Sequence, residues 1–276
     1  MRDNGKTLGG IVDAYNKMCL AGLAATLSAC GLIGDVQDVM DGVTHPVVVG
    51  GLILDVMPSD EPGVQQILDA SSYTPGVSAD LWVVETVMNG TWEDYVLSGT
   101  DVYLHDDASY RAERMGPGSY RVSDAGELAY SAGEMWRVTA TSDTLYEVAE
   151  VSVDLPQALP LAIPATHGVR QDLTLSFGSV PQSYDALLVV VIGPDGEVTY
   201  DNQPAQQFGE DLYLFARSGF QQTFTIPAGA FGFEGVHAIG VAGLMTNAPE
   251  DVFWANTLFS TLMAGQIAFH AVDVAN

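Results

Sequence analysis

The segment VVVGGLILDV, residues 47–56, is the first of a series of short apolar runs that continues to the end of the chain. Its density of Val, Leu and Ile predicts a buried β-strand. Further runs of β-branched and aromatic residues follow at spacings of roughly 10 to 15 residues, separated by Gly, Asp and Ser, as is typical of a β-sandwich. We expect strands over 80–88, 101–106, 118–122, 135–141 and 145–155.

A proline-rich segment, LPQALPLAIP at 155–164, interrupts the series. Proline cannot donate to a sheet ladder and marks strand edges and boundaries, so we place a domain boundary near 155–168. A second series follows, in which Pro194-Asp195-Gly196 supplies the turn of a hairpin. We expect its strands over 172–177, 184–192, 196–201, 211–216, 222–227, 236–245 and 266–274.

One segment favours a helix, SDEPGVQQILDASS at 59–72. Ser59 or Asp60 can cap its first turn, because their side-chain oxygens accept hydrogen bonds from unpaired backbone N–H groups. Pro62 suits the first turn, where its missing N–H has no partner to lose. We therefore expect a short helix between the first two strands.

The chain opens with an uncharged stretch from Met18 to Leu32, which follows Lys17 and contains both cysteines, Cys19 and Cys30. The stretch is short for a membrane span, which needs about 20 strongly apolar residues. A positive residue, an apolar region and small residues at its end are the features of a secretory signal. The alternative is a buried helix with incidental cysteines.

The residues Leu27-Ser28-Ala29-Cys30 resemble the lipobox of bacterial lipoproteins, in which Leu, a small residue, Ala or Gly, and Cys stand in this order. The resemblance implies cleavage between Ala29 and Cys30, a diacylglyceryl group on the Cys30 thiol, and acylation of the new amino terminus. Two or more acyl chains give stable attachment, because each buried CH₂ contributes about 0.8 kcal/mol.

On this interpretation residues 1–29 are a signal peptide, and residues 30–46 are the acylated cysteine with an acidic tether. Gly31 follows the cysteine, whereas an Asp there commonly favours inner-membrane retention in Gram-negative lipoproteins. The resemblance therefore implies a protein anchored by lipid in the bacterial outer membrane or at the cell surface.

A second resemblance lies in the rhythm of glycine turns and aromatic residues, GSY at 118–120 and GEMW at 133–136. This rhythm resembles that of immunoglobulin-like and carboxypeptidase-regulatory-like sandwiches in bacterial surface lipoproteins. Those families are largely structural or binding modules, and the resemblance implies no catalytic residue. The fold class expected is mainly β, with two β-sandwich domains in tandem, 47–156 and 168–276, after an N-terminal signal helix and tether.

The charge is strongly negative, with 35 acidic and 9 basic residues and a formal net charge of -26. After Lys17 all the basic residues are arginines. Nucleic acid as a partner is excluded, because binding needs clustered Lys and Arg to displace counterions from phosphates. Membrane attachment must be covalent or hydrophobic. The acidity itself indicates either solubility in salty surroundings or binding of divalent cations.

Two polar clusters are candidate metal sites. Asp35, Asp38 and Asp41 suggest a Ca²⁺ loop, although an EF-hand loop needs alternate acidic residues and a distal Glu. The alternative there is a solvated linker or a short helix. The second cluster consists of His105, Asp106 and Asp107.

His105, Asp106 and Asp107 could contribute to a metal or acid–base site, or could belong to a solvated hairpin turn. A third group, Trp92 with Glu93 and Asp94, could form the rim of a sugar site, although tryptophans more often pack in cores. The sequence contains no G-x-S-x-G, P-loop, G-x-G-x-x-G or H-E-x-x-H motif. No catalytic residue is therefore assigned, and Ca²⁺ is the one cofactor considered.

The function expected is a lipid-anchored envelope or cell-surface protein that acts as a non-catalytic binding, adhesion or structural module. Its expected partners are the membrane, through Cys30, and other envelope proteins or surface polysaccharide. Two alternatives stay open: an extracellular hydrolase acting on polysaccharide or peptide, and a periplasmic accessory subunit that binds a ligand or Ca²⁺.

Overall fold

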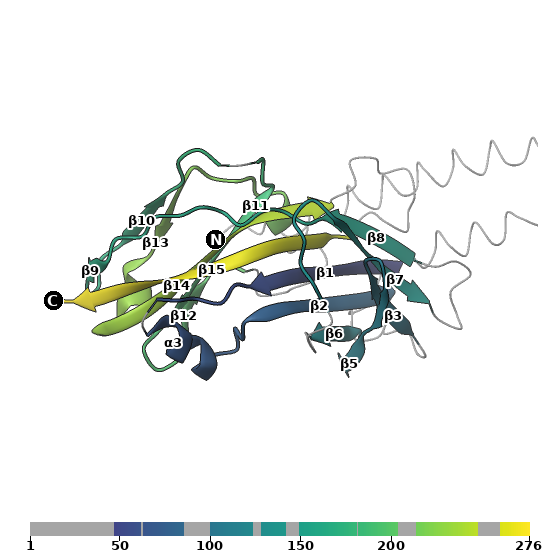
Figure 1. The fold of residues 1–276 in the computed structure, drawn as a ribbon, viewed down its shortest axis with the longest axis horizontal. Coiled ribbons are helices and arrows are strands. Elements are labelled where there is room, and N and C mark those ends of the chain that lie inside the picture. Colours follow the sequence, from purple (N-terminus) through teal and green to yellow (C-terminus); the bar gives the residue numbers. More distant parts are fainter. Residues whose placement is uncertain are drawn as a thin grey trace, which may run out of the picture. The chain divides into compact units, whose positions relative to one another are not determined.

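The computed structural model describes residues 47–61, 63–85, 100–123, 128–141, 149–180, 182–203, 214–247 and 260–276. Pro46–Asn276 forms one compact unit. Within the described ranges no helix is long and apolar enough to cross a membrane. Most of the described elements of this unit are labelled in Figure 1. They are β1 (Val47–Val56), α3 (Val64–Ala70), β2 (Gly76–Glu85), β3 (Asp101–His105), β4 (Ser109–Arg111), β5 (Glu113–Gly116), β6 (Ser119–Ser123), β7 (Met135–Thr141), β8 (Ala149–Asp154), β9 (Thr166–Gly168), β10 (Leu173–Ser176), β11 (Ala186–Ile192), β12 (Val198–Asp201), β13 (Thr223–Ile226), the 3₁₀ helix η2 (Ala228–Phe231), β14 (Gly235–Asn247) and β15 (Leu262–Ala275).

The described strands form three sheets. The largest has the order β12-β11-β14-β15-β1-β2-β6-β5, and β9 pairs with the end of β15. A four-stranded sheet has the order β4-β3-β7-β8, and β10 pairs with β13. The mainly β fold class is confirmed.

β1 joins the early and late parts of the chain. It pairs antiparallel with β2 along its whole length, and parallel with β15 from Gly51↔Leu262 to Val56↔Ile267. Gly50 lies opposite Trp82, and a Cβ at residue 50 would lie 2.5 Å from the Trp82 indole nitrogen. Glycine at this position therefore allows the indole to pack directly against the backbone of β1.

The four-stranded sheet packs against β1, β2 and β6 around a first core. In this part of the molecule, the sandwich half, β6 and β7 alternate buried and exposed residues, because one face of each strand packs on the first core and the other is solvated. Such alternation is the pattern of antiparallel sheets with one wet face. The largest fully buried side chains of the first core are Ile53, Leu81, Leu104, Trp136 and Leu155.

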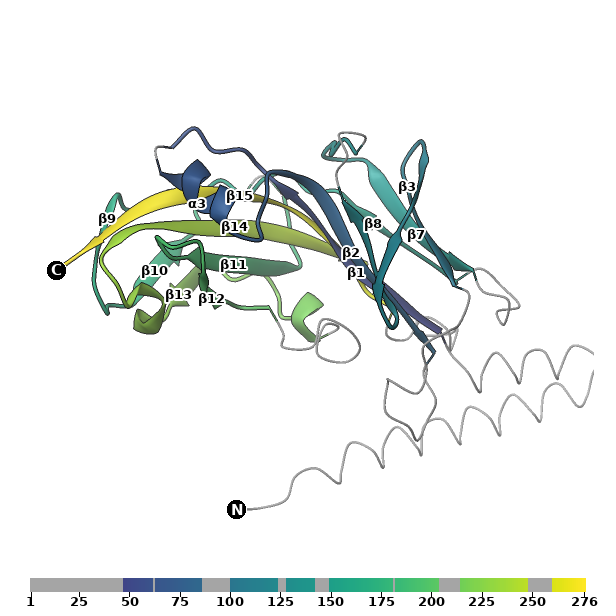
Figure 2. The ribbon, with the colours of Figure 1, turned by 90° about the horizontal axis from the view of Figure 1, so that it is seen from below.

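The part of the large sheet formed by β11, β14 and β15 is covered on both faces. The second core lies on one face, where α3 packs, and the third core lies on the other, where β10, β13 and η2 pack. Figure 2 shows α3 and the β10–β13 pair on opposite sides of these strands. In this covered half, β11 is buried at all seven positions.

The proline-rich segment 155–164 contains no helix or strand and connects β8 with β9. Leu155 belongs to the first core and Leu159 to the third, so the segment carries the chain from one core to another. The expected ranges 47–156 and 168–276 share one sheet through the pairing of β1 with β15. Their limits as domains stay a prediction.

Two local expectations differ from the structure. The helix is shorter than 59–72, and its N-cap is Gly63, with φ of 88°, instead of Ser59 or Asp60. Ser59 and Glu61 instead bond to β15: the Ser59 hydroxyl donates to the Phe269 carbonyl (3.4 Å), and Glu61 accepts the Ala271 N–H (2.6 Å).

The second difference concerns the strand expected over 211–216. Its described residues, 214–216, are helical, and Phe215 and Ala216 pack against the second core. The hairpin at Pro194-Asp195-Gly196 is confirmed, because the Gly193 N–H donates to the Glu197 carbonyl at 2.8 Å between β11 and β12. Gly196 has φ of 83°, a conformation that favours glycine.

Candidate functional site

The candidate residues His105, Asp106 and Asp107 lie at the hairpin turn between β3 and β4. One carboxylate oxygen of Asp106 accepts the Ala108 N–H at 2.6 Å, and the other accepts the Tyr110 hydroxyl at 3.4 Å. A short Asp side chain that bonds to the backbone two residues later is a common way to fix a turn. Asp106 therefore stabilises the hairpin through these bonds.

His105 is held between two hydroxyl groups. Its Nδ1 lies 2.8 Å from the Ser109 Oγ, and its Nε2 lies 2.7 Å from the Thr139 Oγ1 on β7. Partial burial, assisted by the nearby Arg137 guanidinium, lowers the pKa of His105 from its ordinary value of 6.5. Both ring nitrogens are therefore engaged within the four-stranded sheet, and the side chain links the β3–β4 turn to β7.

The structure does not gather this cluster into a metal centre. Within the described ranges, no group of three or more His, Cys, Asp or Glu residues is placed to hold a metal ion. The other candidates fall outside the described residues; these are Leu27, Ser28, Ala29, Cys30, Asp35, Asp38, Asp41, Trp92, Glu93 and Asp94.

The two tryptophans in the described ranges are core residues. Trp136 is fully buried in the first core, and Trp82 packs in the second core with 7% of its surface exposed. Neither indole is available as an exposed platform for a sugar ring.

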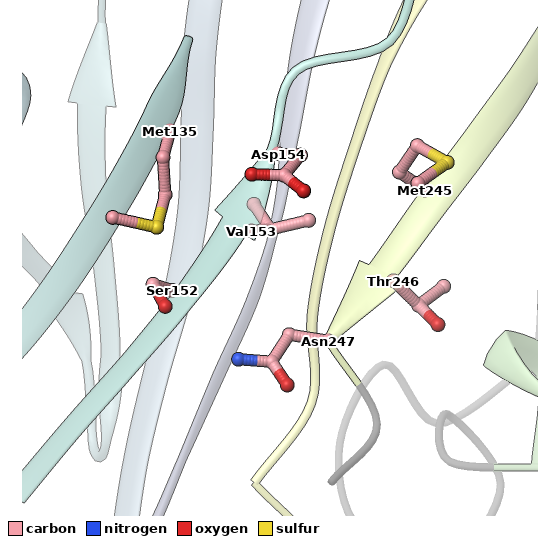
Figure 3. Close-up of a pocket in the computed structure, with 7 residues that line it drawn as sticks. All are labelled: Met135, Ser152, Val153, Asp154, Met245, Thr246 and Asn247. Carbon is pink, nitrogen blue, oxygen red and sulfur yellow. The ribbon is translucent and has the colours of Figure 1, made fainter. Parts of the chain in front are cut away.

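A hollow of about 220 Å³ lies between the end of β8 and the end of β14 (Figure 3). β8 packs beside β14, β15 and β1, which brings these two strand ends together. Val153 and Met245 contribute apolar surface, while Ser152, Asp154 and Asn247 contribute polar groups. The lining residues are Met135, Ser152, Val153, Asp154, Met245, Thr246 and Asn247.

β8 forms one edge of the four-stranded sheet, and its hydrogen bonds to β7 define which backbone groups are free. The Leu155 N–H donates to the Glu134 carbonyl at 2.8 Å, in the same register that pairs Asp154 with Met135. Because hydrogen-bonded and non-bonded pairs alternate along antiparallel strands, Asp154, Ser152 and Glu150 direct their N–H and C=O groups away from β7. Among the described residues, none bonds to these outward groups.

Polar side chains close parts of two other strands where no neighbouring strand continues the ladder. Asn202 lies beside β11, where its side chain accepts the Val189 N–H and donates to the Leu187 carbonyl, both at 2.8 Å. Asp185 similarly accepts the Thr246 N–H of β14 at 2.8 Å. These side chains stand in for a further strand, whereas β8 has no such partner in the described part of the chain.

The arrangement at the hollow suits non-covalent binding of an extended segment. It offers a row of backbone donors and acceptors along β8, an apolar surface beside them and the exposed carboxylate of Asp154. Extended peptides bind open sheet edges through such backbone groups, with alternate side chains entering pockets. The sequence alone does not predict Met135, Met245 or the β8 edge as part of a site. Which strand forms an edge, and which residues lie beside it, depends on how distant strands pair.

No protein-family model matches the chain. A search of curated proteins also gives no match. Among solved structures, the chain is similar to three N-terminal domains of the bacteriophage RB49 highly immunogenic outer capsid protein (Hoc), with 11% identity and a TM-score of 0.21. That match covers 83% of this chain and 59% of the Hoc chain, so this chain spans less than two thirds of that structure. A titin fragment, Titin-A168169, matches with 11% identity and a TM-score of 0.19, covering 84% of this chain and 100% of the fragment.

Proposed function

We propose that this chain is a non-catalytic binding or structural protein of the bacterial envelope, attached to the membrane by lipid on Cys30. On this proposal residues 1–29 are removed, residues 30–46 form the tether, and the β-sandwich fold, of immunoglobulin-like type, is displayed at the outer membrane or cell surface. Its partners are other envelope proteins or surface polysaccharide.

The observation that carries the binding role is the edge of β8 beside the hollow at β14, whose outward backbone groups have no partner in the described part of the chain. A strand edge with free backbone groups is a site for pairing with another chain, and proteins usually block such edges. Here the edges at Leu187 and Val189 on β11, and at Thr246 on β14, are closed by side chains, while Ser152 and Asp154 on β8 keep outward backbone groups. This contrast favours binding at β8.

The polar cluster at the β3–β4 turn supports a structural role for that region. His105 bonds to Ser109 and Thr139, and Asp106 bonds to Ala108 and Tyr110. A general acid or base must reach a substrate proton, whereas these groups bond to neighbours within the same sheet. The acyl anchor is supported by the match of Leu27-Ser28-Ala29-Cys30 to the lipobox.

The anchor is tested by the intact mass of the protein purified from its native membrane. We expect a chain that begins at Cys30 and carries the added mass of a diacylglyceryl group and one further acyl chain. A Cys30→Ala variant should carry no acyl mass.

The matched control is Cys19→Ala, because Cys19 is the other cysteine of the chain and lies in the segment to be removed. Its mature mass should equal that of the wild type. Retention of residues 1–29 with an unmodified thiol at Cys30 would refute the anchor and, with it, the envelope location.

A further inference from the structure

The outward edge of β8 presents three residues in a row to an added strand. Glu150, Ser152 and Asp154 direct their backbone groups away from β7, while Val151 and Val153 turn their side chains into the first core. An antiparallel strand paired with these residues would extend the four-stranded sheet to five strands. This geometry defines the line along which a partner would lie.

The two faces of such an added strand would meet different surroundings. Residues that bond to Glu150, Ser152 and Asp154 place their side chains on the solvated face, as these three residues do. The residues between them place their side chains on the face of Val153, next to Met245 in the hollow. An apolar side chain suits this second face, because Met245 is an adaptable packing partner and Val153 is buried.

The acidic residues of β8 determine which side chains of the added strand are favoured on the solvated face. Asp154 is exposed and has no cationic partner in the described part of the chain, while Glu150 is 3.4 Å from the Arg137 guanidinium. The whole chain is formally -26, with no lysine after Lys17. Opposite charges on directly paired residues stabilise a sheet, so Lys or Arg is favoured opposite Asp154.

The same charges disfavour a second copy of this chain as the occupant. Two β8 strands paired antiparallel about Ser152 would place Glu150 of one copy opposite Asp154 of the other, with acidic side chains on one face. Like charges directly opposite each other destabilise a strand pair. The observations therefore favour a basic partner over self-association.

We propose that the β8 edge binds an extended segment of a partner protein in which Lys or Arg alternates with apolar residues. The basic residues pair with Glu150, Ser152 and Asp154, and an apolar side chain enters the hollow beside Val153 and Met245. This inference rests on the proposed binding function, and it names the site and the class of partner.

The test uses the full chain in detergent and a fluorescent acetylated peptide, Thr-Lys-Val-Lys-Val-Lys-Thr, whose affinity is measured by anisotropy. We expect saturable binding that weakens with salt. The peptide with N-methylated lysine amides should lose binding, because those amides are the ones that face β8. A counterpart with Glu in place of Lys should also fail to bind.

Two variants of the chain locate the site. Ser152→Pro removes an outward N–H without removing a bond to β7, since proline is tolerated at free edges, and we expect about tenfold weaker binding from the lost hydrogen bond and the steric clash of the ring. Asp154→Asn should weaken binding about two- to fivefold and reduce its salt dependence. Asp107→Asn is the matched control, because it also removes one exposed carboxylate, at the β3–β4 turn. In the sheet order β4-β3-β7-β8 this turn is separated from β8 by β7, so the affinity should stay unchanged.

Several results would overturn the proposal: no binding to the wild type, equal binding of the N-methylated peptide, or equal weakening by Asp107→Asn and Asp154→Asn. Self-association in sedimentation that Ser152→Pro abolishes would assign the edge to a second copy instead. The Cys30→Ala chain should bind the peptide as the wild type does. Failure of the anchor and failure of the edge are therefore seen in separate measurements.

Discussion

Two strands of similar length, β7 in the sandwich half and β11 in the covered half, bury their side chains in different ways. β7 alternates, with Trp136, Val138 and Ala140 buried between more exposed neighbours. β11 is buried throughout, from Ala186 to Ile192. The difference follows from what covers each face of the sheet.

In β11 the two faces belong to two cores. Leu188 and Val190 lie in the second core, on the side of α3, while Leu187 and Val189 lie in the third core, on the side of β10 and β13. In β7 the second face is solvated, and Arg137 lies there with its side chain 47% exposed. A strand's tolerance of substitution therefore depends on the number of layers packed against it.

The most destabilising substitutions are expected at two adjacent leucines of β11 and at the buried tryptophan of β7. Leu187→Ala and Leu188→Ala each remove a buried side chain, on opposite faces of β11, so each should reduce the free energy of unfolding by about 2–5 kcal/mol. In β7, Trp136→Ala should cost about 3–5 kcal/mol, while Arg137→Ala should cost less than about 1 kcal/mol because its ion pair with Glu150 is exposed. Urea unfolding of the four variants measures all of these values.

The pattern across the four variants is the critical result. If Leu187→Ala left the unfolding free energy unchanged, the third core would not cover that face of β11. If Arg137→Ala cost as much as Trp136→Ala, the outer face of β7 would not be solvated.

A smaller effect is expected at the edge of β11. Asn202→Ala leaves the Val189 N–H and the Leu187 carbonyl without their side-chain partner, and unsatisfied buried groups of this kind cost about 1–3 kcal/mol. The matched control is Asn276→Ala, which removes an exposed pairing with Glu234 at the end of the chain and should cost under about 0.5 kcal/mol. Thermal unfolding compares the two, and equal losses would contradict the edge-closing role of Asn202.

The contrast between β7 and β11 also explains how far the sequence predicts the fold. MWRVTAT at 135–141 shows the alternation of a half-buried strand, and its expected limits coincide with β7. ALLVVVI at 186–192 is a continuous apolar run, which indicates a strand covered on both faces. Such local patterns depend only on the order of apolar and polar residues along the chain, so the sequence alone predicts them.

Long-range pairing has no comparable local signal. The parallel pairing of Gly51 with Leu262, which places β15 beside β1, joins residues 211 positions apart. The sequence also does not show that β8 is an edge strand. The segment AEVSVD at 149–154 has the same alternation whether or not another strand pairs with its outer side. The sequence shows that His105, Asp106 and Asp107 form a polar cluster, but only the position of Thr139 on β7 shows what holds the imidazole.

Tyr73 packs against the second core, and its ring makes an edge-on contact with the Phe269 ring, with 5.6 Å between the ring centroids. Burial, together with the charges of Asp201 and Asp80, raises the pKa of Tyr73 to about 12. Because the folded pKa lies above the ordinary value of 10.0, the stability contributed is complete below pH 10 and is lost as the pH rises toward 12.

Ultraviolet absorbance of tyrosinate, compared between the wild type and Tyr73→Phe, measures this ionisation directly. We expect the difference between the two titrations to show a step near pH 12 in the folded protein. A step at pH 10 would mean that α3 and β15 leave the phenol exposed to solvent.

The smallest expected effect lies in the sandwich half, at His105. Burial and Arg137 lower the pKa of His105 below 6.5, so the unfolded chain binds a proton more readily than the folded chain does. The stabilisation from this residue is therefore complete above about pH 6.5 and declines as the pH falls toward the folded pKa. The physical reason is that partial burial and the nearby Arg137 guanidinium disfavour the charged imidazolium in the folded protein.

Melting temperatures of the wild type and His105→Asn, measured between pH 8 and pH 5, test this linkage. We expect the wild type to be the more stable at pH 8, because it keeps the bonds to Ser109 and Thr139, and we expect its advantage to shrink below about pH 6.5. An advantage that grew on acidification would mean that His105 is protonated in the fold and paired with Glu150 or Asp106, whose charges act in that direction. The β3–β4 turn would then be held by an ion pair instead of by two hydroxyl groups, and a polar cluster of that kind would regain its interest as an acid–base site.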